Sequence, residues 1–142
     1  MKSSMTTLNL KKVDRVIMCS GKIFYELLTR RQDDQINNVA ILRLEQLYPF
    51  PAEKLMTELA KFPKVKDVVW CQEEPINQGA WYTSRHNFME CIIKNQTLHA
   101  VARDLYAAPA EGSIRQHNIN QSYVIEQALG IQPINNSRSI KK

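Results

Sequence analysis

Two adjacent carboxylates, Glu73 and Glu74, are the residues whose types and spacing most readily suggest chemistry, because paired acids can exchange a proton during catalysis. They follow directly on the apolar run at residues 67–71, which is typical of a buried strand. Successive side chains of an extended segment point in opposite directions, so the two carboxylates cannot share one proton. We therefore expect one of them to pair with a cation or cap backbone N–H groups, and the other to face a partner surface.

A second candidate is the tripeptide Ser20-Gly21-Lys22, which offers a hydroxyl, a flexible turn and an amine at the start of a predicted helix. This combination suits an anion, because a helix N-terminus carries partial positive charge. The tripeptide lacks the glycine spacing of a phosphate-binding loop or of a dinucleotide fingerprint. A plain strand-to-helix turn is therefore favoured, and an anion site stays open.

The three cysteines, Cys19, Cys71 and Cys91, form no Cys-x-x-Cys pair, and no histidine lies at a spacing suited to zinc. Cys19 and Cys71 lie in apolar runs, where a free cysteine acts as a small core residue. We predict structural thiols in a reducing compartment and no metal site.

The histidines give little support for catalysis. His86 and His99 are expected to be satisfied or exposed, whereas His117, near the start of the last predicted helix, could point toward a ligand. The chain shows no Ser/His/Asp ordering and no glycine-flanked nucleophile, so acyl-transfer chemistry lacks support. We predict no catalytic residue; a self-sufficient hydrolase or oxidoreductase that uses Glu73 or His117 is the weakest alternative.

The elements that must position these residues alternate between strand and helix. Alternation of this kind predicts a three-layer α/β domain with a mostly parallel sheet of about five strands and helices on both faces. Ligands of such sheets gather at the carboxyl ends of the strands. The predicted strands are residues 15–19, 39–44, 67–71 and 98–102, and the predicted helices are residues 22–31, 51–62, 80–93 and 113–129, with Gly130 as the final helix stop.

Composition bounds the class of protein. The chain has 142 residues, 44% of them hydrophobic and 23% charged, which is an ordinary globular mix for one domain. No stretch approaches the ~20 apolar residues that span a bilayer, and no aromatic residues interleave with the basic ones as in nucleic-acid grooves. The net charge of +5 comes from residues 1–31, which carry seven basic and two acidic side chains. This surplus marks either an anionic partner or, as we favour, a solvated face.

We divide the chain into a flexible segment at residues 1–12, one domain at residues 13–130, and a flexible polar and basic tail at residues 131–142. The opening Met-Lys-Ser-Ser-Met looks like an added or alternative start and contains no signal-peptide core. A cytoplasmic location is the default expectation.

Four segments, at residues 16–27, 41–51, 69–81 and 109–117, resemble the C-terminal domain of 2-oxoglutarate dehydrogenase, its thiamine-dependent decarboxylating component. The most specific of them reads Gln-Glu-Glu-Pro-x-Asn-Gln-Gly-Ala-Trp at residues 72–81. The resemblance covers about residues 13–130. More remotely, the chain is similar to the C-terminal domains of transketolases and of pyruvate dehydrogenase beta subunits.

The resemblance implies a homodimeric parent enzyme that decarboxylates 2-oxoglutarate on thiamine diphosphate and Mg²⁺. The parent passes a succinyl group to the lipoyl arm of a succinyltransferase component. The setting is the citric acid cycle, with glycolysis as a further association, in the bacterial cytoplasm or the mitochondrial matrix. The Gly-Asp-Gly metal signature of the family is missing here, and the cofactor performs the carbanion chemistry. We therefore expect an excised domain or truncated product with no cofactor of its own, whose partners are the remaining domains and the dimer mate.

Some members of the family carry a regulatory site for a nucleotide or acetyl-coenzyme A in this domain. The resemblance implies that such a site would lie at the strand ends and use Ser20, Lys22, Arg43, Glu74 and Gln78. Arg43 has an alternative role as a strand-end cation paired with Glu45 or Glu74. A free-standing module of the same fold that senses a nucleotide or acetyl-coenzyme A is the second function hypothesis.

Overall fold

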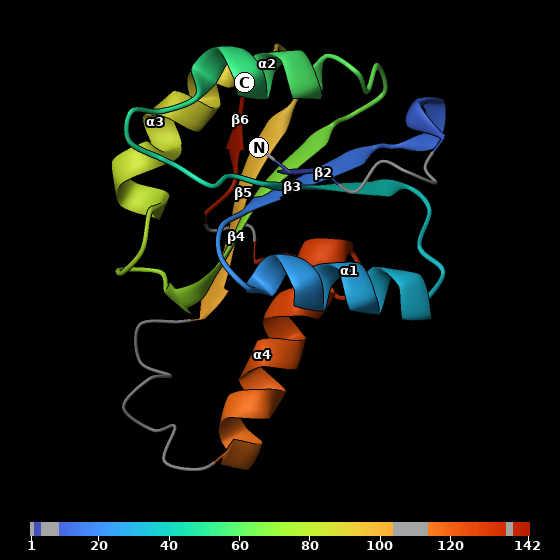
Figure 1. Ribbon diagram of the computed structural model, residues 1–142, viewed down its shortest axis with the longest axis vertical. Helices are drawn as coiled ribbons and strands as arrows, with labels where there is room; N and C mark the ends of the chain where they lie inside the picture. Colours follow the sequence, from blue (N-terminus) through green and yellow to red (C-terminus); the bar gives the residue numbers. More distant parts are fainter. Residues whose placement is uncertain (1, 4–8, 104–113, 136–137) are drawn as a thin grey trace.

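A single sheet carries the fold, with helices packed on both of its faces (Figure 1). The computed structural model describes residues 2–3, 9–103, 114–135 and 138–142. The sheet order is β1-β3-β2-β4-β5-β6, and the four inner strands run parallel. The strands are β1 (Lys2–Ser3), β2 (Arg15–Cys19), β3 (Val39–Arg43), β4 (Asp67–Pro75), β5 (Thr97–Arg103) and β6 (Ile140–Lys141).

Helices α1 (Ile23–Asp33) and α4 (Ile114–Leu129) cover one face, and α2 (Ala52–Leu59) and α3 (Trp81–Cys91) cover the other (Figure 1). A short 3-10 helix, η1 (Leu10–Lys12), precedes β2. The predicted three-layer α/β architecture is confirmed. The sheet has six strands because a two-residue antiparallel strand pairs at each edge, β1 on β3 and β6 on β5.

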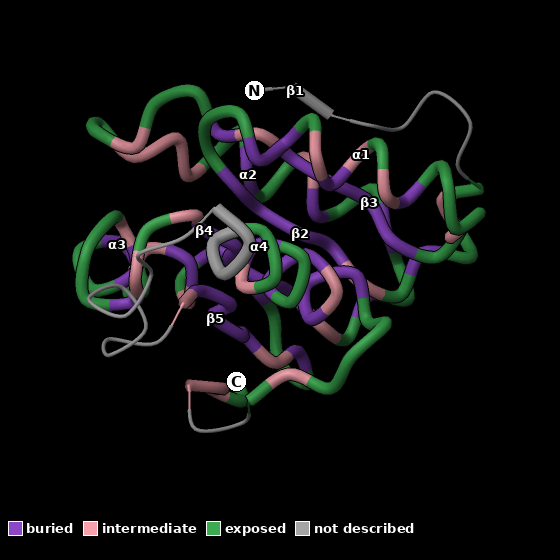
Figure 2. The backbone as a smooth tube through the Cα atoms, turned by 90° about the horizontal axis from the view of Figure 1, so that it is seen from below, coloured by how far each residue is buried: buried purple, intermediate pink, exposed green. Residues whose placement is uncertain are grey.

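The core is split by the sheet into two apolar clusters, because alternate residues of each buried strand point to opposite faces. In β2, Val16 and Met18 belong to the cluster under α2 and α3, whereas Ile17 and Cys19 belong to the cluster under α1 and α4. The inner strands are buried along most of their length (Figure 2). Burial on both faces explains why the sequences of these parallel strands are almost continuously apolar.

Helix α4 ends where the sequence predicts. Gly130 adopts φ +85°, and the N–H of Ile131 donates to the carbonyl of Glu126, which closes the last turn. Arg15 of β2 donates to the carbonyls of Gln127 and Ala128 at 3.1 Å each, and so ties this helix end to the sheet. Within the described residues, no helix is long and apolar enough to cross a bilayer.

Each of the two segments predicted to be flexible contains a short strand in the structure. Lys2–Ser3 pairs with Arg43 and Leu42, and Ile140–Lys141 pairs with Leu98 and Thr97. A strand of two residues is too short to show an alternation of apolar and polar residues, so no sequence pattern predicts it. The domain boundaries at residues 13 and 130 stay a prediction.

Candidate functional site at the strand ends

The signature segment at residues 72–81 is organised by the buried side chain of Gln72, which is 2% exposed. Its Oε1 accepts from the indole N–H of Trp70 at 2.8 Å. Its Nε2 donates to the carbonyls of Glu74, Pro75 and Gln78 at 3.1, 2.9 and 2.6 Å. One amide therefore satisfies one buried donor and serves three backbone acceptors at the end of β4 and in the loop that follows it, with one of its two hydrogens shared.

Gly79 is required where this loop turns into α3. It has φ +75°, and a Cβ atom there would lie 3.0 Å from Oε2 of Glu74 and 3.1 Å from the amide of Gln72. Trp81, the first residue of α3, is only 2% exposed and belongs to the cluster under α2 and α3. The Gln, Gly and Trp of the signature are thus explained by the fold itself.

Glu73 and Glu74 face different neighbours, as their alternation along the chain predicts. Oε1 of Glu73 accepts from Nε2 of Gln121 on α4 at 3.2 Å. The side chain of Glu74 lies against Gly79, on the α3 side of the sheet. Paired acid–base chemistry between these carboxylates therefore has no geometric basis.

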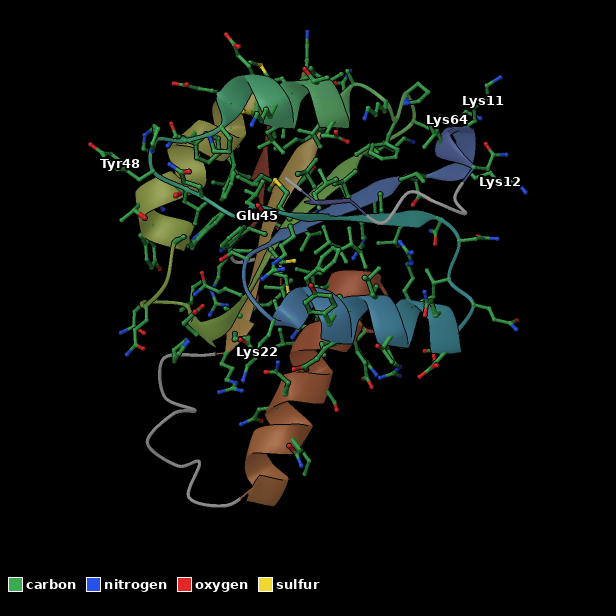
Figure 3. The ribbon with its side chains drawn as sticks, in the orientation of Figure 1. Lys11, Lys12, Lys22, Glu45, Tyr48 and Lys64 are labelled. Carbon is green, nitrogen blue, oxygen red and sulfur yellow. The ribbon has the colours of Figure 1, made fainter. Side chains whose placement is uncertain are left out.

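A cleft of about 690 Å³ opens beside Glu74, between the ends of β2 and β4, the first turns of α3 and the loop at residues 47–50. Tyr48, which is 92% exposed and precedes a cis proline, stands on its rim and points away from the molecule (Figure 3). The lining contains one carboxylate and no lysine or arginine. Its side chains come from Ser20, Leu47, Tyr48, Pro49, Phe50, Trp70, Gln72, Glu74, Ala80, Thr83, Ser84 and Asn87, with Gly79 between them.

The five predicted regulatory residues are divided by the structure. Ser20 and Glu74 line the cleft, whereas Lys22, Arg43 and Gln78 do not. Lys22 is exposed at the start of α1 (Figure 3), and Gln78 is exposed and offers only its carbonyl to Gln72.

Arg43 lies on the α1 side of the sheet. Its Nη1 donates to the hydroxyl of Tyr25 at 3.3 Å, and its guanidinium lies over that ring at 5.4 Å. The predicted alternative, an ion pair with Glu45 or Glu74, does not form among the described residues. Nε of Arg43 is buried and has no hydrogen-bond partner in the described part of the chain. Arg43 is thus a cation without an acidic partner there.

A polar bridge on the same side escaped the sequence analysis. Gln121 of α4 accepts from Arg103 at 2.9 Å and donates to Glu26 and Glu73 at 3.2 Å each. These groups come from α4, β5, α1 and β4, up to 95 positions apart in the chain. No local pattern signals such a contact.

The predicted structural thiols are confirmed as free, buried cysteines. Burial raises the pKa of Cys19 to about 12, partly opposed by the charge of Arg43. Burial also raises the pKa of Cys71 and Cys91. These groups stay protonated near neutral pH and are poor nucleophiles.

His86 is exposed, and His99 is 8% exposed with both ring nitrogens hydrogen-bonded, as predicted for structural histidines. The partners of His99 are Ser139 and Asp67, an arrangement that the sequence analysis missed. It lies at the amino ends of the strands, away from the cleft. The side chain of His117 lies outside the described residues.

Within the described residues, no group of three or more His, Cys, Asp or Glu side chains could hold a metal. The cleft offers one carboxylate and no cation, so its side chains do not fit a diphosphate bound through Mg²⁺.

Comparison with solved structures gives the class of this domain. The fold is similar to that of a split-gene transketolase solved as an inactive β4 tetramer, with a TM-score of 0.53 at 16% identity over 82% of this chain and 38% of that one. The domain therefore has a transketolase-like α/β fold.

Sequence comparison then gives the family. Residues 2–129 match the model of the 2-oxoglutarate dehydrogenase C-terminal family, and the chain belongs to that family. The E1 component of 2-oxoglutarate dehydrogenase from Coxiella burnetii is 48% identical over 123 residues, or 85% of this chain and 13% of that protein. The corresponding proteins of Cupriavidus necator and Haemophilus influenzae are 46% and 48% identical over 86% and 84% of the chain. The chain spans about 13% of the length of these relatives, and none of their names supports the expected association with glycolysis.

Proposed function

We propose that this chain is the C-terminal structural and dimerisation domain of a thiamine-dependent 2-oxoglutarate dehydrogenase and has no decarboxylase activity alone. The observation that carries the proposal is that three residues of the family signature, Gln72, Gly79 and Trp81, make contacts inside the domain. A family signature whose side chains make internal contacts supports a domain with a structural role in the parent enzyme. Thiamine diphosphate and Mg²⁺ would then be bound by the remaining domains of the parent.

The partners in this proposal are those remaining domains, the dimer mate and, indirectly, the lipoyl succinyltransferase component. The parent reaction would be the oxidative decarboxylation of 2-oxoglutarate in the citric acid cycle. The location would follow the parent: the cytoplasm in a bacterium or the mitochondrial matrix in a eukaryote.

A chimeric enzyme tests the proposal. The C-terminal segment of the Coxiella burnetii relative is replaced by this chain, and decarboxylation of 2-oxoglutarate is followed with thiamine diphosphate, Mg²⁺ and an artificial electron acceptor. We expect an active dimeric chimera, an inactive enzyme when the segment is deleted, and no turnover by this chain alone. Turnover by the isolated chain, or a folded chimera that neither dimerises nor reacts, would refute the proposal.

A second candidate function is supported by Arg43. A guanidinium that lies over the ring of Tyr25, has an unpartnered Nε and forms no ion pair within the described part of the chain is suited to an anion. We propose that a nucleotide or acetyl-coenzyme A places its phosphate near Arg43 and Lys22, with Ser20 and Gln78 as further contacts. Of the five predicted residues, Glu74 is left out of this site because it lies on the α3 side of the sheet. The same site would serve a free-standing sensor.

Calorimetric titration of the isolated chain with AMP and with acetyl-coenzyme A tests this site. Arg43→Leu should abolish the binding heat. Arg85→Leu is the matched control, because Arg85 also lies over a tyrosine ring, that of Tyr82 at 5.3 Å, but on the outer surface of α3. Absence of heat with both ligands, or an equal loss in the two variants, would remove the regulatory site.

A further inference from the structure

The C-terminal segment at residues 138–142 is held on the outer edge of β5, although it lies beyond residues 2–129 that match the family. Ile140 and Lys141 pair antiparallel with Leu98 and Thr97. The N–H of Lys142 continues this pairing and donates to the carbonyl of Gln96 at 2.9 Å. The segment thus lies outside the residues matched to the family and occupies a defined register on the edge strand.

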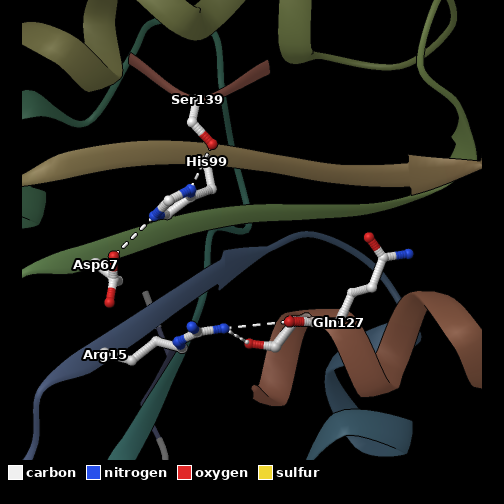
Figure 4. Close-up of polar contacts among 6 residues, drawn as sticks. Arg15, Asp67, His99, Gln127 and Ser139 are labelled. Carbon is white, nitrogen blue, oxygen red and sulfur yellow. Dashed lines mark hydrogen bonds and ion pairs between the residues drawn. The ribbon is translucent and has the colours of Figure 1, made fainter. Parts of the chain in front are cut away.

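Its first polar anchor is the hydroxyl of Ser139. Oγ of Ser139 lies 2.6 Å from Nδ1 of His99, and Nε2 of His99 lies 2.8 Å from Oδ1 of Asp67 (Figure 4). A carboxylate oxygen accepts, so Nε2 is the nitrogen that donates to Asp67, and in that tautomer Nδ1 is the nitrogen that accepts from the hydroxyl of Ser139. Asp67 on β4 therefore fixes His99 on β5 as a ready acceptor for a hydroxyl group.

Its second anchor is the ammonium of Lys142. Nζ donates to the carbonyls of Met89 and Ile92, the latter at 2.7 Å. The carbonyl of Met89 belongs to the last turn of α3, which ends at Cys91, and that of Ile92 belongs to its C-cap residue; a helix C-terminus carries partial negative charge. The end of α3 therefore binds a cation at a fixed distance from His99.

Together these groups form a binding site for an extended peptide with a hydroxyl and an ammonium group three residues apart. Three extended residues span roughly 10 Å, and the anchors fix the register between them. The edge itself is longer than the segment: β5 has seven residues, buried from Leu98 to Ala102, and β6 pairs with two of them. No other described strand pairs with this edge, and an open apolar edge accepts further strands.

We propose that this edge of β5, with His99 and the end of α3, is a self-recognition site that also binds the C-terminal segment of a second copy of the chain. A second copy presents the same Ser139 and Lys142 at the same spacing, so an exchanged strand would make every contact that the internal one makes. The internal segment competes at an effective concentration of the order of millimolar, because it is tethered through residues 130–137. Exchange should therefore grow as the protein concentration approaches that value.

Disulfide trapping in the full chain tests the exchange. Thr97 and Lys141 are register partners, so Thr97→Cys in one copy and Lys141→Cys in another come within disulfide distance only when the strand is exchanged. The native cysteines are buried and do not compete. We expect the mixed disulfide at least about tenfold above a Thr97→Cys and Lys22→Cys control, rising with concentration. Lys22 is exposed at the start of α1, at the opposite end of the parallel sheet from Thr97.

A synthetic peptide tests the recognition separately. It has the sequence of residues 136–142 with cysteine at the position of Lys141, and it is trapped on the Thr97→Cys chain. Replacing the serine at position 139 by alanine should lower the trapped fraction about fivefold, as loss of one hydrogen bond predicts. Replacing the final lysine by alanine should lower it at least as much, because Lys142 makes two hydrogen bonds. Trapping of the peptide no better than a scrambled one would overturn the site. Peptide trapping without mixed disulfide between chains would overturn the second copy as partner. Circular dichroism of each variant confirms that it is folded.

Discussion

At the scale of single residues, the candidate site is organised by side chains that hydrogen-bond to, or pack against, the backbone. Gln72 holds three carbonyls, and Gly79 leaves room for Glu74 and for Gln72 itself. Arg43 is the contrasting residue, because its charge has no acidic partner among the described residues. The first two explain the signature, and the third is the best position for a ligand contact.

Gln72→Leu should destabilise the chain by about 3 kcal/mol, because it leaves the indole N–H of Trp70 and the loop carbonyls without partners. Urea unfolding measures this loss. Gln46→Leu is the matched control: Gln46 is exposed and donates only to the carbonyl of Tyr48, so its change should stay within about 0.5 kcal/mol. Equal costs would mean that Gln72 does not organise the loop.

Gly79→Ala should cost more than Gly130→Ala. Both glycines have positive φ, which costs an alanine about 1–2 kcal/mol. At Gly79 the new Cβ would also lie 3.0 Å from Glu74, whereas at Gly130 its nearest neighbour is Arg15 at 3.5 Å. Thermal unfolding of the two variants therefore separates crowding from backbone strain, and a larger loss at Gly130 would contradict the geometry.

The buried thiols should react with an aromatic disulfide reagent slowly in the native chain at pH 8 and completely in denaturant. Burial raises the pKa of Cys19 from 9.0 to about 12, so the folded chain keeps its proton where the unfolded chain loses it. The thiol thus contributes stability that is complete below pH 9 and is lost as the pH rises toward 12. Cys19→Ala should flatten this alkaline decline, and rapid native labelling of Cys19 would contradict it.

At the scale of elements, the strand ends decide what the site can be. The signature places a bulged extension of β4 between Cys71 and Pro75 and then starts α3 on the buried Trp81. The carboxyl ends of β2 and β4 are thereby separated by a cleft from α3. Because adjacent strand residues face opposite layers, the residues predicted to form one site are distributed over both faces.

Trp81→Ala should cost about 3–5 kcal/mol, the usual range for removing a large buried side chain. Its neighbour Tyr82 is 53% exposed, so Tyr82→Ala should cost less than about 1 kcal/mol. Denaturant unfolding of the two variants compares burial within one helical turn. A loss below 1 kcal/mol for Trp81→Ala would mean that the residue does not anchor α3.

At the scale of the whole molecule, the exposed aromatic residues are the best clue to assembly. About half or more of the side-chain surface is exposed in three tyrosines, Tyr25, Tyr48 and Tyr82. Tyr48 lies in the loop at residues 47–50, which lines the cleft. In contrast, the basic residues Lys11, Lys12 and Lys64 lie near η1, on a different part of the molecule from Tyr48 (Figure 3). An exposed aromatic side chain of this kind suits contact with the rest of a larger enzyme.

Tyr48→Asp should leave the isolated chain unchanged in stability, within about 0.5 kcal/mol, because the side chain makes almost no internal contact. In the chimeric enzyme the same change should lower the fraction of dimer and the activity together, which sedimentation and turnover measure. Lys54→Asp, on exposed α2, is the control. A dimer unaffected by Tyr48→Asp would place this residue outside the interface.

The α/β class, the inner strands and the helices could be predicted from local sequence patterns, because strands buried on both faces are apolar runs and helices have apolar residues at helical spacing. The sequence also determined the family, through the decapeptide at residues 72–81. Three contacts became known only from the folded structure. Ser20 and Glu74 share a cleft that does not include Arg43. Gln121 hydrogen-bonds to three charged side chains from strand ends and a helix, and Ser139 hydrogen-bonds to His99. Those contacts depend on strand register and on side chains up to 95 positions apart, which no local pattern encodes.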